Sequence, residues 1–153
     1  MSQVQARVLQ PGEGEMIRVV TDTVRVLADG AATGGRLFIF EEITEPGHGP
    51  PLHRHGVDDE YFFVLEGEFT FVIDGQRVAV SKGAFVVAPK GSQHTFTNSG
   101  STTGRMLIVT TPPGLESPFR ETAAMPELTP EKLTAAFAKF NLSIEGPPLG
   151  AGR

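Results

Sequence analysis

The sequence of 153 residues contains no cysteine and no tryptophan, and only one of its residues is a tyrosine. Without cysteine the chain has no disulfide framework, no thiolate metal site and no cysteine nucleophile. Its composition therefore fits a reducing compartment, and any metal that it binds must be held by nitrogen and oxygen atoms. A chain of this length is about one domain and buries a core without such cross-links.

Long apolar runs and clusters of basic residues are also missing. No run approaches the roughly 18 apolar residues of a membrane helix, and the first residues, MSQVQARVLQPGEGEM, lack the apolar stretch of a signal peptide. Lysine and arginine number 13 against 18 acidic residues, which gives a net charge of −5 and argues against nucleic acid as a partner. We expect a soluble, cytoplasmic protein that binds neither nucleic acid nor a membrane.

The region from Met16 to Thr111 is a series of short segments with strand-like composition, separated by Gly, Pro, Asp and Asn. Examples are MIRVV, TVRVLA, RLFIFEEI, EYFFVLE, EFTFVID, RVAV, AFVVAP, HTFTN and RMLIVT. No interval of helix length separates them, which predicts an all-β sandwich or barrel. The pair Asp74-Gly75 between two such runs predicts a tight hairpin over residues 69–80.

The composition changes after Thr111, where the sequence Pro-Pro-Gly closes the strand series. A helix is predicted to begin at Pro130 with Thr129 as its cap, and its apolar stripe consists of Leu133, Phe137 and Phe140. We expect this stripe to pack on the outside of the barrel, with a dimer contact or a lid as the alternatives. The last residues, GPPLGAGR, are predicted to be a loose end.

Two histidines and a glutamate lie close together in the segment PGHGPPLHRHGVDDEYFFVLEGE. His53 and His55 are two residues apart, so on an extended strand both imidazoles point to the same face. Glu60 follows beyond Gly56 and the acidic pair 58–59, which predicts a loop or bulge that brings a carboxylate back to the same point.

A third histidine lies in the segment KGAFVVAPKGSQHTFTN, where His94 follows a Pro-Lys-Gly turn and begins a strand. A lone histidine is more often a satisfied core residue. A His-x-His pair with a nearby glutamate and a distant histidine is, by type and number, a set of metal ligands. The predicted ligands are His53, His55, Glu60 and His94.

These residues give the sequence a family resemblance, because the two segments resemble the two motifs of the cupin superfamily. The first motif, G-x5-H-x-H-x4-E-x6-G, is matched by Gly47, His53, His55, Glu60 and Gly67. The second, G-x5-P-x-G-x2-H-x3-N, is matched by Gly83, Pro89, Gly91, His94 and Asn98. The resemblance implies an all-β double-stranded β-helix, or jelly roll, in which residues 1–111 form the barrel with its motifs at 47–67 and 83–98. Residues 112–153 are then a Pro-rich, helical extension that packs on the barrel.

The resemblance also implies a cofactor. In cupins the residues at these four positions hold one divalent transition metal inside the barrel, which can be iron, nickel, manganese, cobalt, copper or zinc. Four protein ligands in a six-coordinate sphere leave about two positions open for water, dioxygen or a chelating substrate, which is typical of a catalytic site.

Other residues near the motifs receive weaker predictions. By strand alternation Phe62 and Val64 lie beside Glu60, and Phe96 lies beside His94, so these three are predicted to line a substrate pocket, with plain core packing as the alternative. Tyr61 is expected to point outward and His48 to be exposed. The pair Asp58-Asp59 is expected to form a solvated turn, with replacement of Glu60 as ligand as its lesser alternative.

Within the superfamily the layout is similar to small bacterial quercetin dioxygenase-like proteins. This implies an oxidoreductase that dioxygenates a small chelating aromatic or enol substrate, with Glu60 as ligand and as catalytic base, and it implies a homodimer. A non-redox, metal-dependent isomerase, cyclase or hydrolase is the alternative, and a small-molecule-binding protein without catalysis is a third reading.

Overall fold

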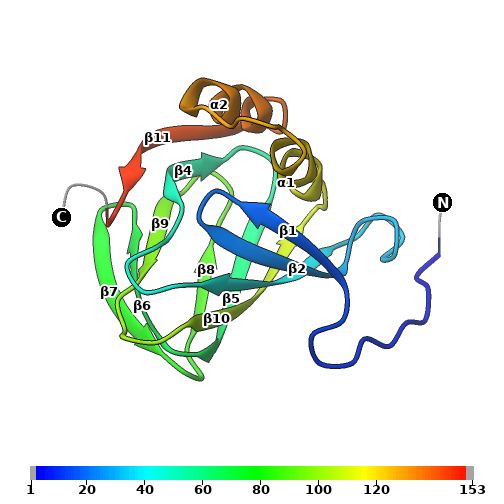
Figure 1. Ribbon diagram of the computed structural model, residues 1–153, viewed down its shortest axis with the longest axis horizontal. Coiled ribbons are helices and arrows are strands. Elements are labelled where there is room, and N and C mark those ends of the chain that lie inside the picture. Colours follow the sequence, from blue (N-terminus) through cyan, green and yellow to red (C-terminus); the bar gives the residue numbers. More distant parts are fainter. Residues whose placement is uncertain (1–2, 151–153) are drawn as a thin grey trace.

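The computed structural model describes residues 3–150, which form two antiparallel sheets facing each other, with two helices at one end (Figure 1). The first sheet has the strand order β1 (Glu15–Val19), β2 (Asp22–Ala28), β3 (Phe38–Thr44), β10 (Gly104–Thr111), β5 (Asp59–Glu66) and β8 (Phe85–Ala88). The second has the order β11 (Leu142–Pro148), β4 (Pro51–His55), β9 (Gln93–Asn98), β6 (Glu68–Ile73) and β7 (Gln76–Ser81). The helices are α1 (Glu116–Ala123) and α2 (Pro130–Ala138).

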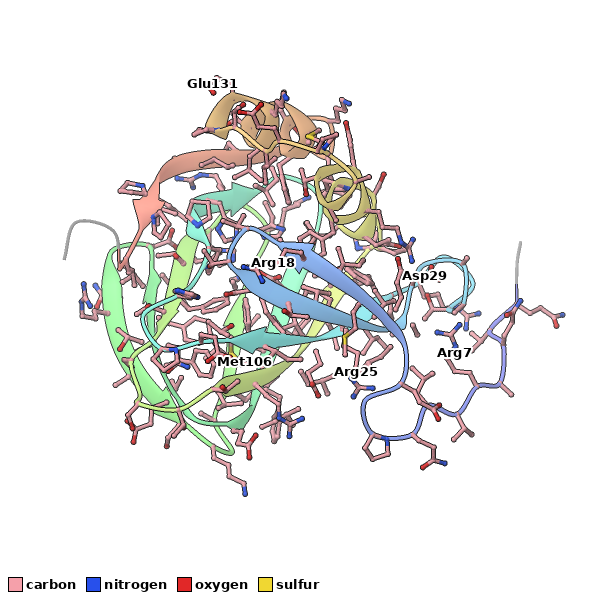
Figure 2. All side chains as sticks on the ribbon, in the orientation of Figure 1. Arg7, Arg18, Arg25, Asp29, Met106 and Glu131 are labelled. Carbon is pink, nitrogen blue, oxygen red and sulfur yellow. The ribbon has the colours of Figure 1, made fainter. Side chains whose placement is uncertain are left out.

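The core lies between the sheets, because apolar side chains alternate along the strands with a period of two. On β10, for example, every second residue is buried, including Met106, which lies inside the barrel in Figure 2. Phenylalanines from both sheets meet there, and the rings of Phe62 and Phe71 are 5.0 Å apart in an edge-to-face arrangement. The predicted all-β jelly roll is confirmed.

The predicted hairpin is also confirmed. Strands β6 and β7 pair from Glu68 with Ser81 to Ile73 with Gln76, which leaves two residues for the turn. Asp74 and Gly75 have φ angles of 48° and 80°, the left-handed values that this turn requires.

Helix α2 begins where the sequence predicted. The hydroxyl of Thr129 accepts a hydrogen bond from the backbone N–H of Lys132 at 3.2 Å, and Pro130 occupies the first turn. Phe137 is buried and faces the barrel, whereas Glu131 points away from it in Figure 2. The helix ends at Ala138, so Phe140 continues the apolar stripe from the turn that follows.

The expected loose end is wrong for residues 146–148, which belong to a strand. Residues 142–148 form strand β11, which pairs with β4 so that Leu142 lies opposite His55 and Ile144 lies opposite His53. Its prolines are tolerated because β11 is an edge strand, and the register shifts around Gly146 and Pro148. The prediction also extended over residues 151–153, which lie outside the described part of the chain.

Within residues 3–150, none of the helices has both the length and the apolar character needed to cross a membrane.

Candidate metal centre

The four predicted ligands come from three strands in both sheets. His53 and His55 project from β4, and His94 lies directly opposite His53 on the neighbouring strand β9. Glu60 reaches the same point from β5 in the other sheet. One ligand atom from each of the four residues lies within 4.8 Å of all the others. The barrel thus brings together all the residues that the spacing of the motifs predicted.

The distances within this cluster suit a single ion. Glu60 Oε1 is 3.0 Å from His94 Nε2 and 3.4 Å from His55 Nε2. Metal–ligand bonds of about 2.0–2.2 Å place two ligands on opposite sides of one ion about 4 Å apart, and adjacent ligands closer together. The four donor atoms lie within 4.8 Å of one another, so shifts of about half an ångström bring all of them to bonding distance of one metal.

Each imidazole is oriented by a hydrogen bond at its Nδ1 atom. The acceptors are the carbonyl oxygen of Pro51 for His53 at 2.7 Å, Oδ1 of Asp58 for His55 at 2.8 Å, and the carbonyl oxygen of Ser92 for His94 at 3.3 Å. Because carbonyl and carboxylate oxygens only accept, Nδ1 carries the proton in each ring. Each Nε2 then faces the cluster, where a metal binds histidine once any proton on that nitrogen is displaced. In the metal-free protein Nε2 of His94 is hydrogen-bonded to Oε1 of Glu60 at 3.0 Å.

His55 provides a direct test of whether the site fits a metal. Its Nε2 atom is fully buried and has no hydrogen-bond partner. A buried polar atom without a partner costs about 1–3 kcal/mol, so such atoms are rare unless a water or an ion satisfies them. A divalent ion bound by this nitrogen would remove that cost, so the residues fit the cofactor that the family resemblance implies.

Two of the ligands are already in the protonation state that binds metals. Burial, together with the charges of His94 and His55, lowers the pKa of His53 to about 3, so this imidazole is neutral at pH 7. Burial alone would raise the pKa of Glu60, but the surrounding histidines hold it down to about 2, so Glu60 is a carboxylate.

His55 behaves differently. Burial acts to lower its pKa, but the carboxylates of Glu60 and Asp58 outweigh burial and raise it. In the metal-free protein His55 thus holds a proton on Nε2 more tightly than an ordinary histidine does. Binding of a metal displaces this proton, which makes the affinity for metal dependent on pH.

The prediction of a solvated turn at residues 58–59 is wrong for Asp58. Asp58 is completely buried, because the chain turns back after His55 and places this carboxyl against the His55 ring. Asp59 is half-buried and accepts a hydrogen bond from the backbone N–H of Lys90 at 2.8 Å. The spacing His-x-x-Asp was the available signal for this contact, since a tight turn brings such residues together.

The predicted pocket residues divide into two groups. Phe96 lies on the wall of a cavity that opens beside the histidines. Phe62 and Val64 are not on this wall: they are buried in the core between the sheets, where Phe62 packs edge-to-face on Phe71 and Phe96. Their alternation with Glu60 gives the correct face of the strand but not the depth within the barrel. His48 is exposed as expected.

The cavity has a volume of about 60 Å³ and is bounded mainly by apolar side chains. Its wall includes residues from the β1–β2 turn, β3, both helices and β11, among them Val20, Phe40, Phe119, Phe137 and Leu142. The C-terminal extension thus forms one side of the cavity beside the candidate metal centre.

The wall also contains one ionisable residue that was not predicted from the sequence, Glu42 of β3. Phe38, Phe40, Glu42 and Thr44 share the inward face of β3, and all four are buried. The signal was present in the sequence as an acidic residue on the same face as two phenylalanines. It was hidden because Glu41, directly before it, is also acidic and faces outward to Arg25 and Arg105.

The central part of the chain matches a known protein family. Residues 40–110 match the family described as the cupin domain, a stretch that contains all four candidate ligands. No curated protein matches the chain in sequence.

Solved structures share the fold. A predicted oxalate decarboxylase from Thermotoga maritima is 22% identical, with a TM-score of 0.64, over 69% of this chain and 98% of its own. The polyketide cyclase RemF from Streptomyces resistomycificus is 24% identical, with a TM-score of 0.63, over 70% of this chain and 80% of its own. KdgF from Halomonas sp. is 17% identical, with a TM-score of 0.65, over 73% and 98%. At these identities the similarity shows the fold alone.

Proposed function

We propose that this cupin-fold protein is a metal-dependent oxygenase that acts on a small chelating aromatic or enol substrate, in the manner of quercetin dioxygenase-like proteins. The observation that carries the proposal is the arrangement of three imidazoles, each fixed at Nδ1, around one buried carboxylate. This cluster lies beside an apolar cavity, so a small molecule in the cavity would lie next to a metal held by these four residues.

Each of the four ligand residues has a defined role in this proposal. His53, His55 and His94 hold the metal, and Glu60 contributes both an oxygen ligand and a negative charge. When bound, the metal supplies Lewis acidity and, for a redox-active ion, the ability to couple with dioxygen. Glu60 is ionised at neutral pH, so it is in the state that accepts the proton of a substrate hydroxyl.

The cavity wall determines the kind of substrate. Its apolar side chains exclude water, which strengthens the electrostatic interactions between a bound substrate and the site. A volume of about 60 Å³ has room for about four waters at roughly 15 Å³ each, which suits a small molecule. A substrate of flavonol size requires that the side chains of α1 and α2 move outward.

Non-redox chemistry at the same metal site is the second candidate. Three histidines and one glutamate also bind zinc, which polarises a carbonyl for isomerisation, cyclisation or hydrolysis without oxygen. One protein of similar fold is a polyketide cyclase. Binding of a small molecule without catalysis is the third candidate.

A homodimer and a cytoplasmic location stay predictions. Size-exclusion chromatography tests the homodimer.

The deciding experiment measures oxygen uptake by the protein reconstituted separately with iron, nickel, manganese, cobalt, copper and zinc, with quercetin and smaller enols as substrates. We expect uptake with at least one redox-active metal and none with zinc. In the Glu60→Gln variant we expect part of the metal to remain bound while turnover is lost. Turnover that proceeds without oxygen and with zinc would instead identify non-redox chemistry, and unchanged turnover in Glu60→Gln would exclude Glu60 as the base.

A further inference from the structure

A second pair of carboxyl groups lies in the barrel, apart from the metal cluster. Glu42 of β3 and Asp22 of β2 are 7% and 2% exposed. Val24 is the strand partner of Glu42, so Asp22, two residues before it on the same face of β2, is a diagonal neighbour of Glu42. Glu42 is on the wall of the same cavity as His53, His55 and Glu60. The metal-binding role described above does not use either residue.

The surroundings of the pair show which residue carries a proton. The negative charge of Asp22 raises the pKa of Glu42, because two buried neighbouring carboxyl groups do not both ionise readily. Asp22 accepts hydrogen bonds at both of its oxygens, from the hydroxyl of Thr21 at 3.4 Å and from that of Thr44 at 3.1 Å. These hydroxyls stabilise a negative charge on Asp22, and the proton therefore resides on Glu42.

The pKa values agree with this assignment. Burial, followed by the charge of Asp22, raises the pKa of Glu42 well above its ordinary value. Burial also raises the pKa of Asp22, but the hydrogen bonds that it accepts oppose the shift. Among the described residues of the cavity wall, only Glu42 and Glu60 have carboxyl groups, one neutral and one ionised. In many active sites, two carboxyl groups with opposite protonation states act as the general acid and the general base.

We propose that Glu42 is the proton donor of the cavity and contacts an anionic oxygen of a substrate whose other oxygens bind the metal. In the transfer, the O–H bond of Glu42 breaks, a new O–H bond forms on the substrate, and Glu42 is left as a carboxylate. Asp22 lies between Glu42 and the exposed residue Thr21, so the proton returns from solvent on that side. This inference rests on the proposed metal site, and it narrows the substrate to small molecules with oxygens at both ends, such as dicarboxylates and oxygenated enols.

The test uses oxalate as the probe, because oxalate chelates a metal through two oxygens and directs its other two away from the ion. Cobalt-loaded wild type, Glu42→Gln, Glu42→Ala and the control Glu45→Gln, at an exposed glutamate just after β3, are titrated with oxalate by calorimetry. The cobalt content of every sample is measured at the same time. Removing a hydrogen bond to a charged oxygen weakens binding about tenfold or more, and we expect this loss in Glu42→Ala but not in Glu45→Gln. Equal affinity of Glu42→Ala and wild type at full cobalt content would overturn the proposal and leave the metal site intact. Failure of the wild type to bind cobalt would overturn the metal site and this inference together.

If Glu42→Ala does not fold, the pH dependence of oxalate affinity in wild type and Glu42→Gln tests the proposal instead. In Glu42→Gln the side chain has nearly the same shape and keeps an N–H donor, but the amide does not ionise. The titratable groups whose charges act on the carboxyl pair are Glu60 and His48, and both are retained in this variant. We expect the oxalate affinity of the wild type to fall at high pH as Glu42 loses its proton, and that of Glu42→Gln to lack this fall. Identical pH profiles for the two proteins would contradict the assignment.

Discussion

Oδ1 of Asp58 lies 2.8 Å from Nδ1 of His55, and both side chains are buried. The contact fixes the ring with its Nε2 atom directed into the cluster and makes the imidazole more basic, because a carboxylate accepts its other N–H. Asp58 is therefore a positioning residue: it orients a ligand without binding the metal itself. Its effect is exerted entirely through His55.

The first prediction concerns this contact. Replacing Asp58 by Ala removes the partner of the His55 Nδ1–H, so we expect the affinity for metal to fall about 10–100-fold. The neighbouring change Asp59→Ala is the control, because Asp59 binds a backbone N–H outside the cluster and should change metal affinity much less. Competition titrations against a coloured chelator measure both affinities. Equal metal affinity of Asp58→Ala and wild type would show that the contact does not support the site.

The second prediction concerns the stability of the metal-free protein in acid. The pKa of His53 is about 3 in the folded protein, against 6.5 for an ordinary histidine, so between these values the unfolded chain binds a proton that the folded protein excludes. The stabilisation is thus complete above pH 6.5 and is lost as the pH falls toward 3. This site contributes a slope of about 1.4 kcal/mol per pH unit to the free energy of unfolding.

Urea unfolding between pH 5 and 6.5 measures this effect as the difference in slope between wild type and His53→Gln. Glu60 titrates in a lower range, and Glu42, whose raised pKa gives a slope of opposite sign, is present in both proteins. We expect the slope to become flatter in His53→Gln and to persist in His48→Gln, which changes an exposed histidine. A slope that is the same in His53→Gln and wild type would assign the pH dependence to other groups.

The third prediction concerns Asn98, the last residue of the second motif. Its buried amide donates to the carbonyls of Thr44 at 2.8 Å and Thr102 at 2.9 Å, and it accepts from the N–H of Gly100 at 2.9 Å. Asn98→Ala leaves these groups without partners, so we expect a loss of about 1–3 kcal/mol in the free energy of unfolding. Asn98→Asp should cost more, because a carboxylate would face two carbonyl oxygens.

Denaturant unfolding measures the loss, and metal content measured at saturation supplies the comparison. The structure gives Asn98 no place among the ligands, so the folded variants should still bind one metal per chain. A variant of unchanged stability that no longer binds metal would contradict this structural role.

The four ligands could be predicted from the sequence because strand geometry fixes where alternate side chains point. His53 and His55 share a face because they are two residues apart on one strand. His94 joins them because it lies opposite His53 on the neighbouring strand. The type I′ turn at Asp74-Gly75 was predictable for a similar reason, since few residues tolerate its positive φ angles. In each case a local rule and the overall fold agree.

The remaining features depend on contacts between distant segments. Strand β11 was missed because Gly146 and Pro148 are typical of a loop, and only the free edge of β4 made a strand possible. Whether Phe62 lies in the core or on the cavity wall depends on how deep the core extends along the barrel. Strand alternation predicts the face of a side chain but not this depth. Glu42 becomes a candidate only because β2 brings Asp22 beside it.

The metal centre is tested most directly by elemental analysis of tag-free wild type, His94→Ala and His48→Gln by plasma mass spectrometry. We expect about one divalent transition metal per chain in wild type and in His48→Gln, and loss of this metal in His94→Ala. Wild-type protein that contains no metal even after reconstitution, or His94→Ala that retains a full equivalent, would contradict the metal centre.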